Sequence, residues 1–506
     1  MSFDPSAPVI VRTAQQTWRE PDAGRTPLDA LQAVADKALA GELGTDLKNS
    51  IDCLATVRFI MDTDPNLAAL LPRNPGLLLA ERLGIAKASF YQTDIGGNTP
   101  QFLVNHFAGR LAAGEFKAVL ISGAELLNTF FTALKTGGDI SQWRDRDTVL
   151  PQMIGEEKEG LNSQESAHGL FEPVNTYPLF ESALRHRNGE QPDSTEKTTA
   201  DLFASMSAVA ARNPNAWQRE AQDAQQIARV HEGNRYIGFP YTKSMNALLS
   251  VDMAAAVVIT TAGHAKALGI PESDWIYLRA GTDLNEVWHP SERPDLDRSP
   301  ALGIAVKKAM ETAQLSLDEI DCFDIYSCFP SALRIACDEI GLSPMDSRGV
   351  TVTGGLPFFG GPGNNYSLHA IAETVERLKR DGGNGLVTAN GLYLTKHSVG
   401  IYSSKPGPAP WQAINCETLQ QAINAGPRRQ LAEDPQGEIT LEAATVAFSR
   451  KGPKLGIVIG SNTAGDRVIA NIPGDAPYIN RLLDQDVVGM TGKVQVLGGK
   501  NVFSFD

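Results

Sequence analysis

Two stretches of alternating strand-like and helix-like sequence constrain the fold of this chain most strongly. In the first, the apolar run Pro8–Arg12 precedes a helix that begins at Pro27, with Thr26 placed to cap it. Further strand-like runs follow at residues 51–57, 88–93 and 117–122, separated by helical patterns. Such alternation is typical of a layered α/β domain.

The second stretch repeats this rhythm after a long interruption. Residues 126–239 lack a clear period and predict an inserted region with some helices, for example at 221–231. The alternation resumes at Val251–Thr260, and further strands and helices are expected up to residue 405. We therefore predict a first α/β half from residues 1–125 and 240–270, and a second half from 271–405.

The last hundred residues have a different texture. Pro406–Pro410 reads as a linker, and several β-like runs follow within residues 411–506. A five-stranded barrel of the oligonucleotide/oligosaccharide-binding type fits this length. The net charge of −14 repels phosphate backbones, so we expect a docking or substrate-covering module and no nucleic-acid partner.

Five widely spaced cysteines in 506 residues argue against a disulfide framework and for a reducing, cytoplasmic location. No cysteine pair has metal-ligand spacing near a histidine, so no metal site is expected. The sequence shows no signal peptide, and no apolar run reaches the roughly 18 residues needed to span a membrane.

Four ordered motifs resemble the thiolase superfamily over roughly the first 400 residues. They are LAAGEFKAVLISGAE (111–125), NALLSVDMAAAVVI (246–259), DIYSCFP (324–330) and TGGLPFFGGPG (353–363). Among thiolases the chain is most similar to the sterol-carrier-type thiolase-like proteins type 1, which carry an added C-terminal domain. The resemblance implies the layered thiolase fold, two βαβαβαββ halves in five αβαβα layers, and a site for acyl-CoA thioesters.

The catalytic positions depart from the family pattern. By the resemblance, the nucleophilic cysteine falls at or beside Gly97, and the histidine of the Gly-His-Pro motif falls at Gly361. The residue that holds the oxyanion water becomes Tyr326, and the late cysteine falls near Asn390; only Cys328 keeps a family acid/base position. Ordinary thiolysis needs the thiolate and the oxyanion donors, so its mechanism should be lost.

Four side chains are the candidate catalytic groups. Tyr326 and Cys328 lie two residues apart, at a strand-to-helix turn where both could face a pocket or merely pack beneath the loop. The sequence there resembles the Tyr-Asp-x-Phe motif of thiolase-fold steroid aldolases, which cut 3-hydroxyacyl-CoA esters with tyrosines and depend on a partner of the same barrel type. Tyr366 and His369 lie three apart at a helix start, so His369 could replace the lost histidine or be structural.

The remaining candidates are backbone loops and a possible coenzyme contact. Gly97 and Asn98 open a helix whose free N–H groups could hold an oxyanion, or they form a simple turn. Gly360 and Gly361 form a second such loop. The resemblance places Lys243 and Asn246 in the pantetheine-binding loop of coenzyme A, although a single lysine is usually just solvated.

These residues leave three hypotheses open. The first is a non-standard acyltransferase of the acetyl-CoA acetyltransferase kind, with coenzyme A as substrate and no permanently bound cofactor. The second is a retro-aldolase acting on a 3-hydroxyacyl-CoA, and the third is an acyl-CoA-binding protein without catalysis. The resemblance also implies dimerisation through the strand around Tyr91, although the added domain could block it and leave a monomer.

Overall fold

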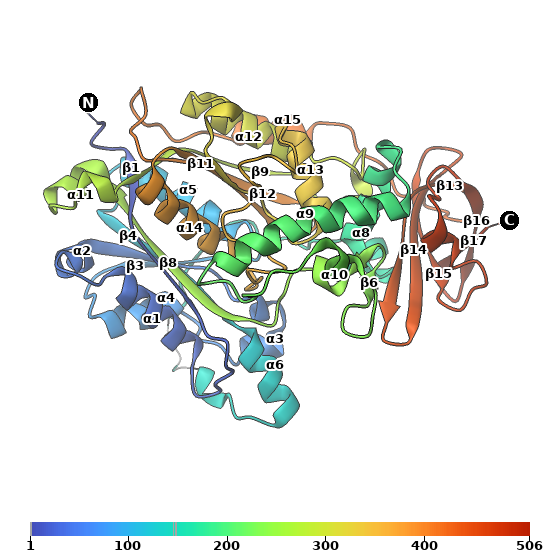
Figure 1. Ribbon diagram of the computed structural model, residues 1–506, viewed down its shortest axis with the longest axis horizontal. Helices are drawn as coiled ribbons and strands as arrows, with labels where there is room; N and C mark the ends of the chain where they lie inside the picture. The colour runs from blue at the N-terminus through green and yellow to red at the C-terminus, as the bar shows by residue number, and fades with distance from the viewer. Residues whose placement is uncertain (1–2, 145, 147–148, 506) are drawn as a thin grey trace.

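A ten-stranded sheet runs through the larger part of this computed structural model, which describes residues 3–144, 146 and 149–505 (Figure 1). The strand order is β10-β11-β12-β9-β1-β8-β4-β2-β3-β5. Its two halves meet where β1 pairs with β9 through only Val9 with Tyr277 and Ile10 with Ile276. The strands are β1 (Pro8–Thr17), β2 (Ile51–Thr56), β3 (Ser89–Thr93), β4 (Ala118–Leu126), β5 (Gln152–Ile154), β8 (Asp252–Thr261), β9 (Ile276–Asn285), β10 (Cys322–Asp324), β11 (Asn384–Gly391) and β12 (Lys396–Ser403).

Helices cover both outer faces and fill the space between the two halves (Figure 1). On the first half lie α1 (Pro27–Ala38), α2 (Gly44–Ser50), α3 (Pro65–Ala68), α4 (Pro75–Leu83) and α11 (Ala262–Ala267). The central layer holds α5 (Thr99–Ala112) and α14 (Tyr366–Asp381), which contact strands of both halves. The second half is covered by α12 (Pro300–Ala313) and α13 (Pro330–Ile340). The predicted layered arrangement in two halves is therefore confirmed.

The interruption between the halves contains more helix than its sequence pattern predicts. Besides α10 (Ala224–Ala228), it forms α6 (Leu127–Thr136), α7 (Ser163–Ala167), α8 (Pro173–Arg187), α9 (Pro192–Arg212), β6 (Tyr236–Gly238) and β7 (Tyr241–Thr242). Helix α8 buries polar side chains such as Glu181 and Arg185 along with its apolar ones. An amphipathic period is hidden when a helix is covered on several sides, which explains why the sequence did not predict it.

Strand β5 lies beside β3, the strand around Tyr91 through which the resemblance implies dimerisation. It pairs in parallel with β3, with Tyr91 opposite Gln152 and Thr93 opposite Ile154. The backbone groups of these β3 residues that face β5 are therefore paired within the chain, and the three-residue strand β5 is the edge of the sheet.

The C-terminal strands form a small closed barrel. The strands β13 (Gly437–Ser449), β14 (Gly452–Asn462), β15 (Arg467–Pro473), β17 (Lys500–Ser504) and β16 (Thr491–Leu497) pair in that order, and β16 returns to β13. Only β15 and β17 run parallel, and the short helix α16 (Arg481–Asp484) precedes β16. The five-stranded barrel predicted from the sequence is confirmed.

The barrel docks on the inserted region at one end of the molecule (Figure 1). Strand β6 extends the barrel sheet, because Gly238 pairs with Ala447 of β13. Arg467 is 1% exposed and donates to the carbonyl of Arg293, 2.6 Å away, and to Glu442. The connecting helix α15 (Glu417–Asn424) contacts β9 through two hydrogen bonds between Gln420 and Asn285.

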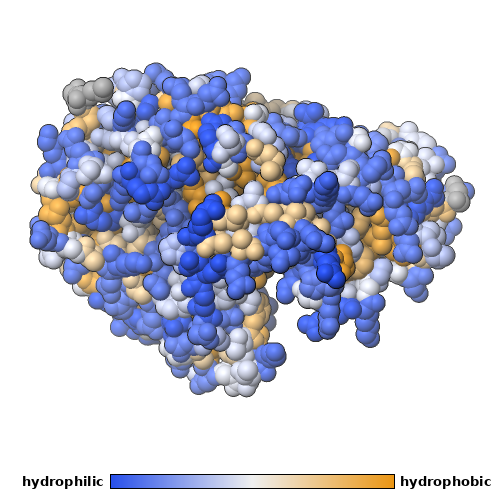
Figure 2. Space-filling model, viewed as in Figure 1, coloured by the Kyte–Doolittle hydropathy of each residue, from blue (hydrophilic) through white to orange (hydrophobic). Residues whose placement is uncertain are grey.

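The visible surface is mostly hydrophilic, with scattered hydrophobic patches (Figure 2). Within the described residues, no helix combines the length and apolar character required to cross a membrane. The same residues contain no group of three or more histidine, cysteine, aspartate or glutamate side chains placed to hold a metal ion.

Candidate active site

The side-chain space above Gly97 is filled by a tyrosine. Gly97 lies between β3 and α5, and a Cβ built on it would overlap the hydroxyl oxygen of Tyr326 and lie 2.7 Å from the carbonyl oxygen of Asn390. Tyr326 is 7% exposed, and its hydroxyl makes no hydrogen bond to any described residue. The structure thus places an unpaired phenol where the resemblance puts a thiolate.

The loop around Gly97 also supplies backbone donors. The Gly96 N–H is taken by the Asn364 side-chain oxygen at 3.1 Å, and the Gly97 carbonyl accepts from Ser367 at 2.7 Å. The N–H groups of Gly97 and Asn98 have no acceptor among the described residues. They precede α5, so the helix dipole adds to their ability to hold an anion or a polarised carbonyl oxygen.

Cys328 lies beside Tyr326 in a tight polar cluster. The Asn390 amide nitrogen donates to the Tyr177 hydroxyl at 2.9 Å and contacts the Cys328 sulfur at 3.8 Å. The Asn390 side-chain oxygen is buried and has no partner among the described residues. Burial raises the pKa of Cys328 to about 12, so the thiol stays protonated at neutral pH.

Tyr326 is likewise neutral at physiological pH. Burial raises its pKa well above the usual value, and the neighbouring Cys328 acts in the same direction. A neutral phenol of this kind can donate a hydrogen bond or a proton, and its raised pKa makes it a poor base at neutral pH.

Tyr366 packs against Tyr326, but its hydroxyl is committed elsewhere. The two rings meet edge to face with centroids 5.5 Å apart. The Tyr366 hydroxyl donates to the buried carboxylate of Asp324 at 2.9 Å and bonds to Thr353 at 2.7 Å. The structure thus brings Tyr366 to the centre as a wall, while its polar end anchors the loop that follows Thr353.

His369 does not reach this cluster by any contact of the described residues. Its Nδ1 bonds to the Gln15 side-chain oxygen of β1 at 2.7 Å, and its ring packs on Phe359. Complete burial lowers the pKa of His369 to about 3, so the ring is neutral. The three-residue spacing from Tyr366 was correct for a helix, but one turn is enough to direct His369 to the sheet. The hypothesis that His369 replaces the lost histidine gains no support from this placement.

The second glycine loop differs from the first. The Gly361 N–H is used by the Leu248 carbonyl at 2.9 Å, so it is not available to an oxyanion. Gly360 has φ of +120°, and a Cβ there would lie 2.7 Å from the sulfur of Met253. This loop is held by packing and backbone pairing, and the prediction that its backbone closely approaches a ligand stays a prediction.

The segment around Lys243 and Asn246, which the resemblance assigns to coenzyme A, contacts the candidate site near Cys328 through its backbone. The Ala247 N–H donates to the Cys328 carbonyl at 3.0 Å. The Asn246 side chain donates to the Thr242 carbonyl at 2.6 Å, and its oxygen is buried without a partner among the described residues. Lys243 is exposed, and no contact brings it to the centre. Their role in binding coenzyme A stays a prediction.

Two supporting side chains could not be found from local sequence. Tyr177 comes from α8 in the irregular insertion, and its ring stacks on Phe329 with centroids 4.4 Å apart. Lys396 is 5% exposed, pairs with Asp94 and donates to the Ile95 carbonyl at 3.1 Å, directly before the Gly97 loop. The only local signal for Lys396 is a charge inside an apolar strand pattern.

Comparisons with known proteins agree with this architecture. The family model of the thiolase-like protein type 1 additional C-terminal domain matches residues 418–498. A monomeric SCP2-thiolase-like protein type 1 from Mycobacterium smegmatis is 33% identical and has a TM-score of 0.84, covering 99% of this chain and 100% of that chain. No curated protein matches the chain.

Two further solved structures share the fold at lower identity. The Ltp2-ChsH2(DUF35) aldolase is 17% identical with a TM-score of 0.58, covering 79% of this chain and 98% of that chain. The dimeric peroxisomal thiolase of Saccharomyces cerevisiae is 14% identical with a TM-score of 0.59, covering 80% of this chain and 99% of that chain. The predicted thiolase fold with an added barrel is confirmed.

Proposed function

Because the chain belongs to the SCP2-thiolase-like protein type 1 family, we propose that it binds an acyl-CoA thioester and cleaves the carbon–carbon bond of a 3-hydroxyacyl group. The observation that carries this proposal is the Tyr326 hydroxyl standing in the side-chain space of Gly97. A phenol there can donate to a thioester oxygen, and because burial raises its pKa well above the usual value it is a poor nucleophile for forming an acyl-enzyme.

Acyl transfer, the other reaction suggested by the resemblance, has less support. Gly97 carries no nucleophile, and the nearest thiol is Cys328, whose pKa of about 12 leaves almost no thiolate at neutral pH. A transferase would need a covalent carrier or a directly activated acceptor, and no described histidine contacts Cys328 or Tyr326.

The retro-aldol reaction suits a site made of hydrogen-bond donors. When the C2–C3 bond breaks, the 3-hydroxyl loses its proton and C3 becomes the carbonyl carbon of a released aldehyde or ketone. The electron pair of the broken bond remains on C2 and spreads to the thioester oxygen as an enolate, which a proton on C2 then converts into the shortened acyl-CoA. The Tyr326 hydroxyl and the N–H groups of Gly97 and Asn98 would hold that oxygen. Their effect would be strong because the site is shielded from water.

The added barrel has a natural place in this proposal. The Ltp2-ChsH2(DUF35) aldolase carries two component names. In this chain the barrel belongs to the same polypeptide as the thiolase-like body and contacts it through β6 and Arg467. We propose that the barrel supplies in one chain what a partner supplies in such aldolases. The five unpaired cysteines support a reducing compartment such as the cytoplasm for this reaction.

Binding without turnover is the second candidate, and one observation favours it. A retro-aldol reaction needs a base for the 3-hydroxyl proton, and neither Cys328 nor Tyr326 loses its proton near neutral pH. Such a protein would hold acyl-CoA at the same donors and release it unchanged.

A mass-spectrometric product assay separates these candidates. The chain is incubated with a panel of 3-hydroxyacyl-CoAs and, in parallel, with acetoacetyl-CoA plus free coenzyme A. Cleavage of a 3-hydroxyacyl-CoA, lowered by about 100-fold in Tyr326→Phe and unchanged in the exposed barrel variant Arg450→Ala, is the expected result.

The other outcomes are also informative. Acetyl-CoA formed from acetoacetyl-CoA would overturn the proposal and indicate that Cys328 is activated. Saturable acyl-CoA binding in calorimetry, with no product from either incubation, would establish the second candidate.

A further inference from the structure

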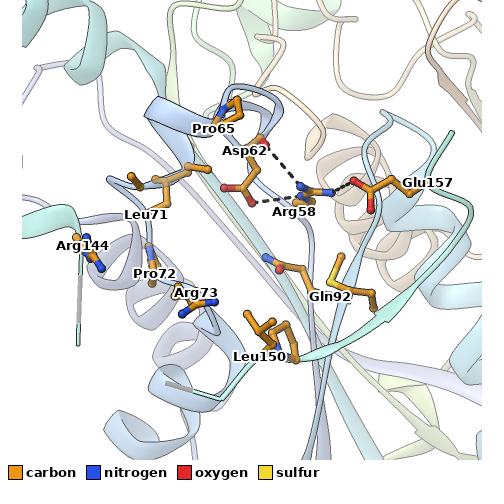
Figure 3. A pocket seen from close by; sticks show the side chains of 14 residues that line it. Arg58, Asp62, Pro65, Leu71, Pro72, Arg73, Gln92, Arg144, Leu150 and Glu157 are labelled. Atoms are coloured by element: carbon orange, nitrogen blue, oxygen red, sulfur yellow. Dashed lines mark hydrogen bonds and ion pairs between the residues drawn. The ribbon is translucent and has the colours of Figure 1, made fainter. Parts of the chain in front are cut away.

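A separate cavity lies at the edge of the sheet, between the loop after β2 and the segment around β5 (Figure 3). Its volume is about 480 Å³, which falls in the range of small-molecule sites. Its walls include Arg58, Arg73, Gln92, Leu71, Leu150 and Met153. None of the residues proposed above for thioester binding lines it.

Gln92 gives this cavity an unsatisfied polar group. Its side chain projects from β3 and lines the cavity, although only 5% of the residue is exposed. The side-chain amide makes no hydrogen bond to any described residue. Because its amide atoms reach solvent through the cavity, a ligand carboxylate that enters can accept a hydrogen bond from the Gln92 side-chain nitrogen.

The described lining includes the three arginines Arg58, Arg73 and Arg144, of which Arg144 is engaged by other residues. Arg58 is held by Asp62 at 3.5 Å and by Glu157 at 3.2 Å, which fixes its guanidinium in the wall (Figure 3). Arg73 is exposed, and no described residue forms an ion pair with it. A guanidinium beside an amide donor matches the two oxygens of a carboxylate.

The apolar part of the wall determines the rest of the ligand. Leu150 and Met153 are 64% and 50% exposed, which is unusual for large hydrophobic side chains. Both line the cavity, and Leu150 lies near Arg73 in Figure 3. Such surfaces are commonly covered by a ligand or a partner.

We propose that this cavity binds a small amphipathic carboxylate. Its carboxylate pairs with Arg73 and accepts from Gln92, and its alkyl chain covers the exposed Leu150 and Met153. The site is physically continuous with the catalytic loop, because Asn364 bonds both to the Arg58 carbonyl at 2.9 Å and to the Gly96 N–H. Binding itself does not depend on the function proposed above.

Calorimetric titration with sodium octanoate tests the proposal on the full chain, with sodium acetate as the head group alone. The expected result is saturable octanoate binding, with acetate much weaker. Arg73→Ala should raise the dissociation constant about tenfold, whereas the exposed Arg450→Ala should leave it unchanged. Gln92→Leu should also weaken octanoate, with its fold checked by circular dichroism.

Two results would overturn the proposal. One is an absence of saturable heat with octanoate, or equal affinity in the Arg73→Ala and Arg450→Ala variants. The other is a dimer in sedimentation analysis that Arg73→Ala dissociates, because the cavity would then be covered by a second copy. Octanoate binding that persists in Tyr326→Phe, even in a chain without lyase activity, separates this site from the proposed function.

Discussion

By the resemblance to thiolases, Gly97 and Gly361 fall at the two positions where that family keeps catalytic side chains, yet their surroundings in this chain differ. Neither residue has φ in the left-handed region, so backbone conformation does not require glycine at either position. A Cβ at Gly97 would overlap the Tyr326 hydroxyl, whereas a Cβ at Gly361 would lie 3.4 Å from its nearest neighbour, the Ala247 Cβ. The side-chain space at Gly97 is occupied by Tyr326, whereas a methyl group at Gly361 would make only ordinary van der Waals contacts.

The difference teaches that the two losses have different consequences. At Gly97 a side chain and the present position of the Tyr326 ring exclude each other, so a cysteine at position 97 would require Tyr326 to move. At Gly361 there is room for a small side chain, and only the loop pairing through Leu248 limits it. We therefore regard Gly97 and Tyr326 as the two residues of the candidate site that fit closely against each other.

The largest expected effect is that of Gly97→Ala. The added methyl group must displace either the Tyr326 ring or the Asn390 backbone, and overpacking of this kind costs roughly 3 kcal/mol. Urea unfolding followed by circular dichroism measures the loss. A change below about 0.5 kcal/mol would show that the Tyr326 ring moves freely and that the two residues are not interlocked.

The next prediction tests the same interlock by a double-mutant cycle. Tyr326→Ala removes the ring that the methyl group would strike, so Gly97→Ala should cost less in that background. We expect a coupling free energy of about 2 kcal/mol between the two sites, measured by the same unfolding experiment. If the two single effects add, Gly97 and Tyr326 do not interact, and the contrast drawn between Gly97 and Gly361 is wrong.

A third prediction concerns Glu125, which lies beneath the second loop. Its side chain is fully buried and accepts from the Ile60 N–H at 2.7 Å, and burial raises its pKa to about 8. The folded state therefore holds a proton that the unfolded state releases near pH 4. Stability should fall by up to about 1.4 kcal/mol per pH unit as pH rises from about 4 to about 8.

Glu125→Gln is the matched variant for that measurement. Glutamine cannot ionise, so its stability should be flatter than that of the unmodified chain between pH 5 and pH 8. Urea unfolding at several pH values gives both curves. Parallel curves would mean that the pKa of Glu125 is the same in the folded and the unfolded chain.

The smallest effect is expected for Gly361→Ala. Its methyl group meets only ordinary contacts, so the cost should stay below about 1 kcal/mol. Unfolding midpoints of this variant and Gly97→Ala, compared in one experiment, provide the control for each other. A loss as large as that of Gly97→Ala would remove the distinction between the two glycines.

Much of this arrangement could be predicted from sequence, because it is encoded in short segments. The strands at 51–57 and 117–122, the barrel after Pro410 and the position of Gly97 all follow from local patterns or motif spacing. The domain boundaries at 125/126 and 410/411 stay predictions.

The rest depends on contacts between distant segments. Tyr177 meets Asn390 across 213 positions, and Lys396 meets Asp94 across 302. No local pattern specifies such partners. The contact of His369 with Gln15 was hidden for a related reason, because helical spacing gives the face of a residue but not the element that packs on it.

The pairing of β6 with β13 has a consequence for how the chain is made. Gly238 leaves the ribosome long before its partner Ala447, since the two are 447 − 238 = 209 residues apart. At about 5–20 residues per second, the inserted region waits roughly 10–40 s with an unpaired strand edge. During that interval the edge of β6 is open to other strands, and only the synthesis of β13 brings the partner that covers it in the folded chain.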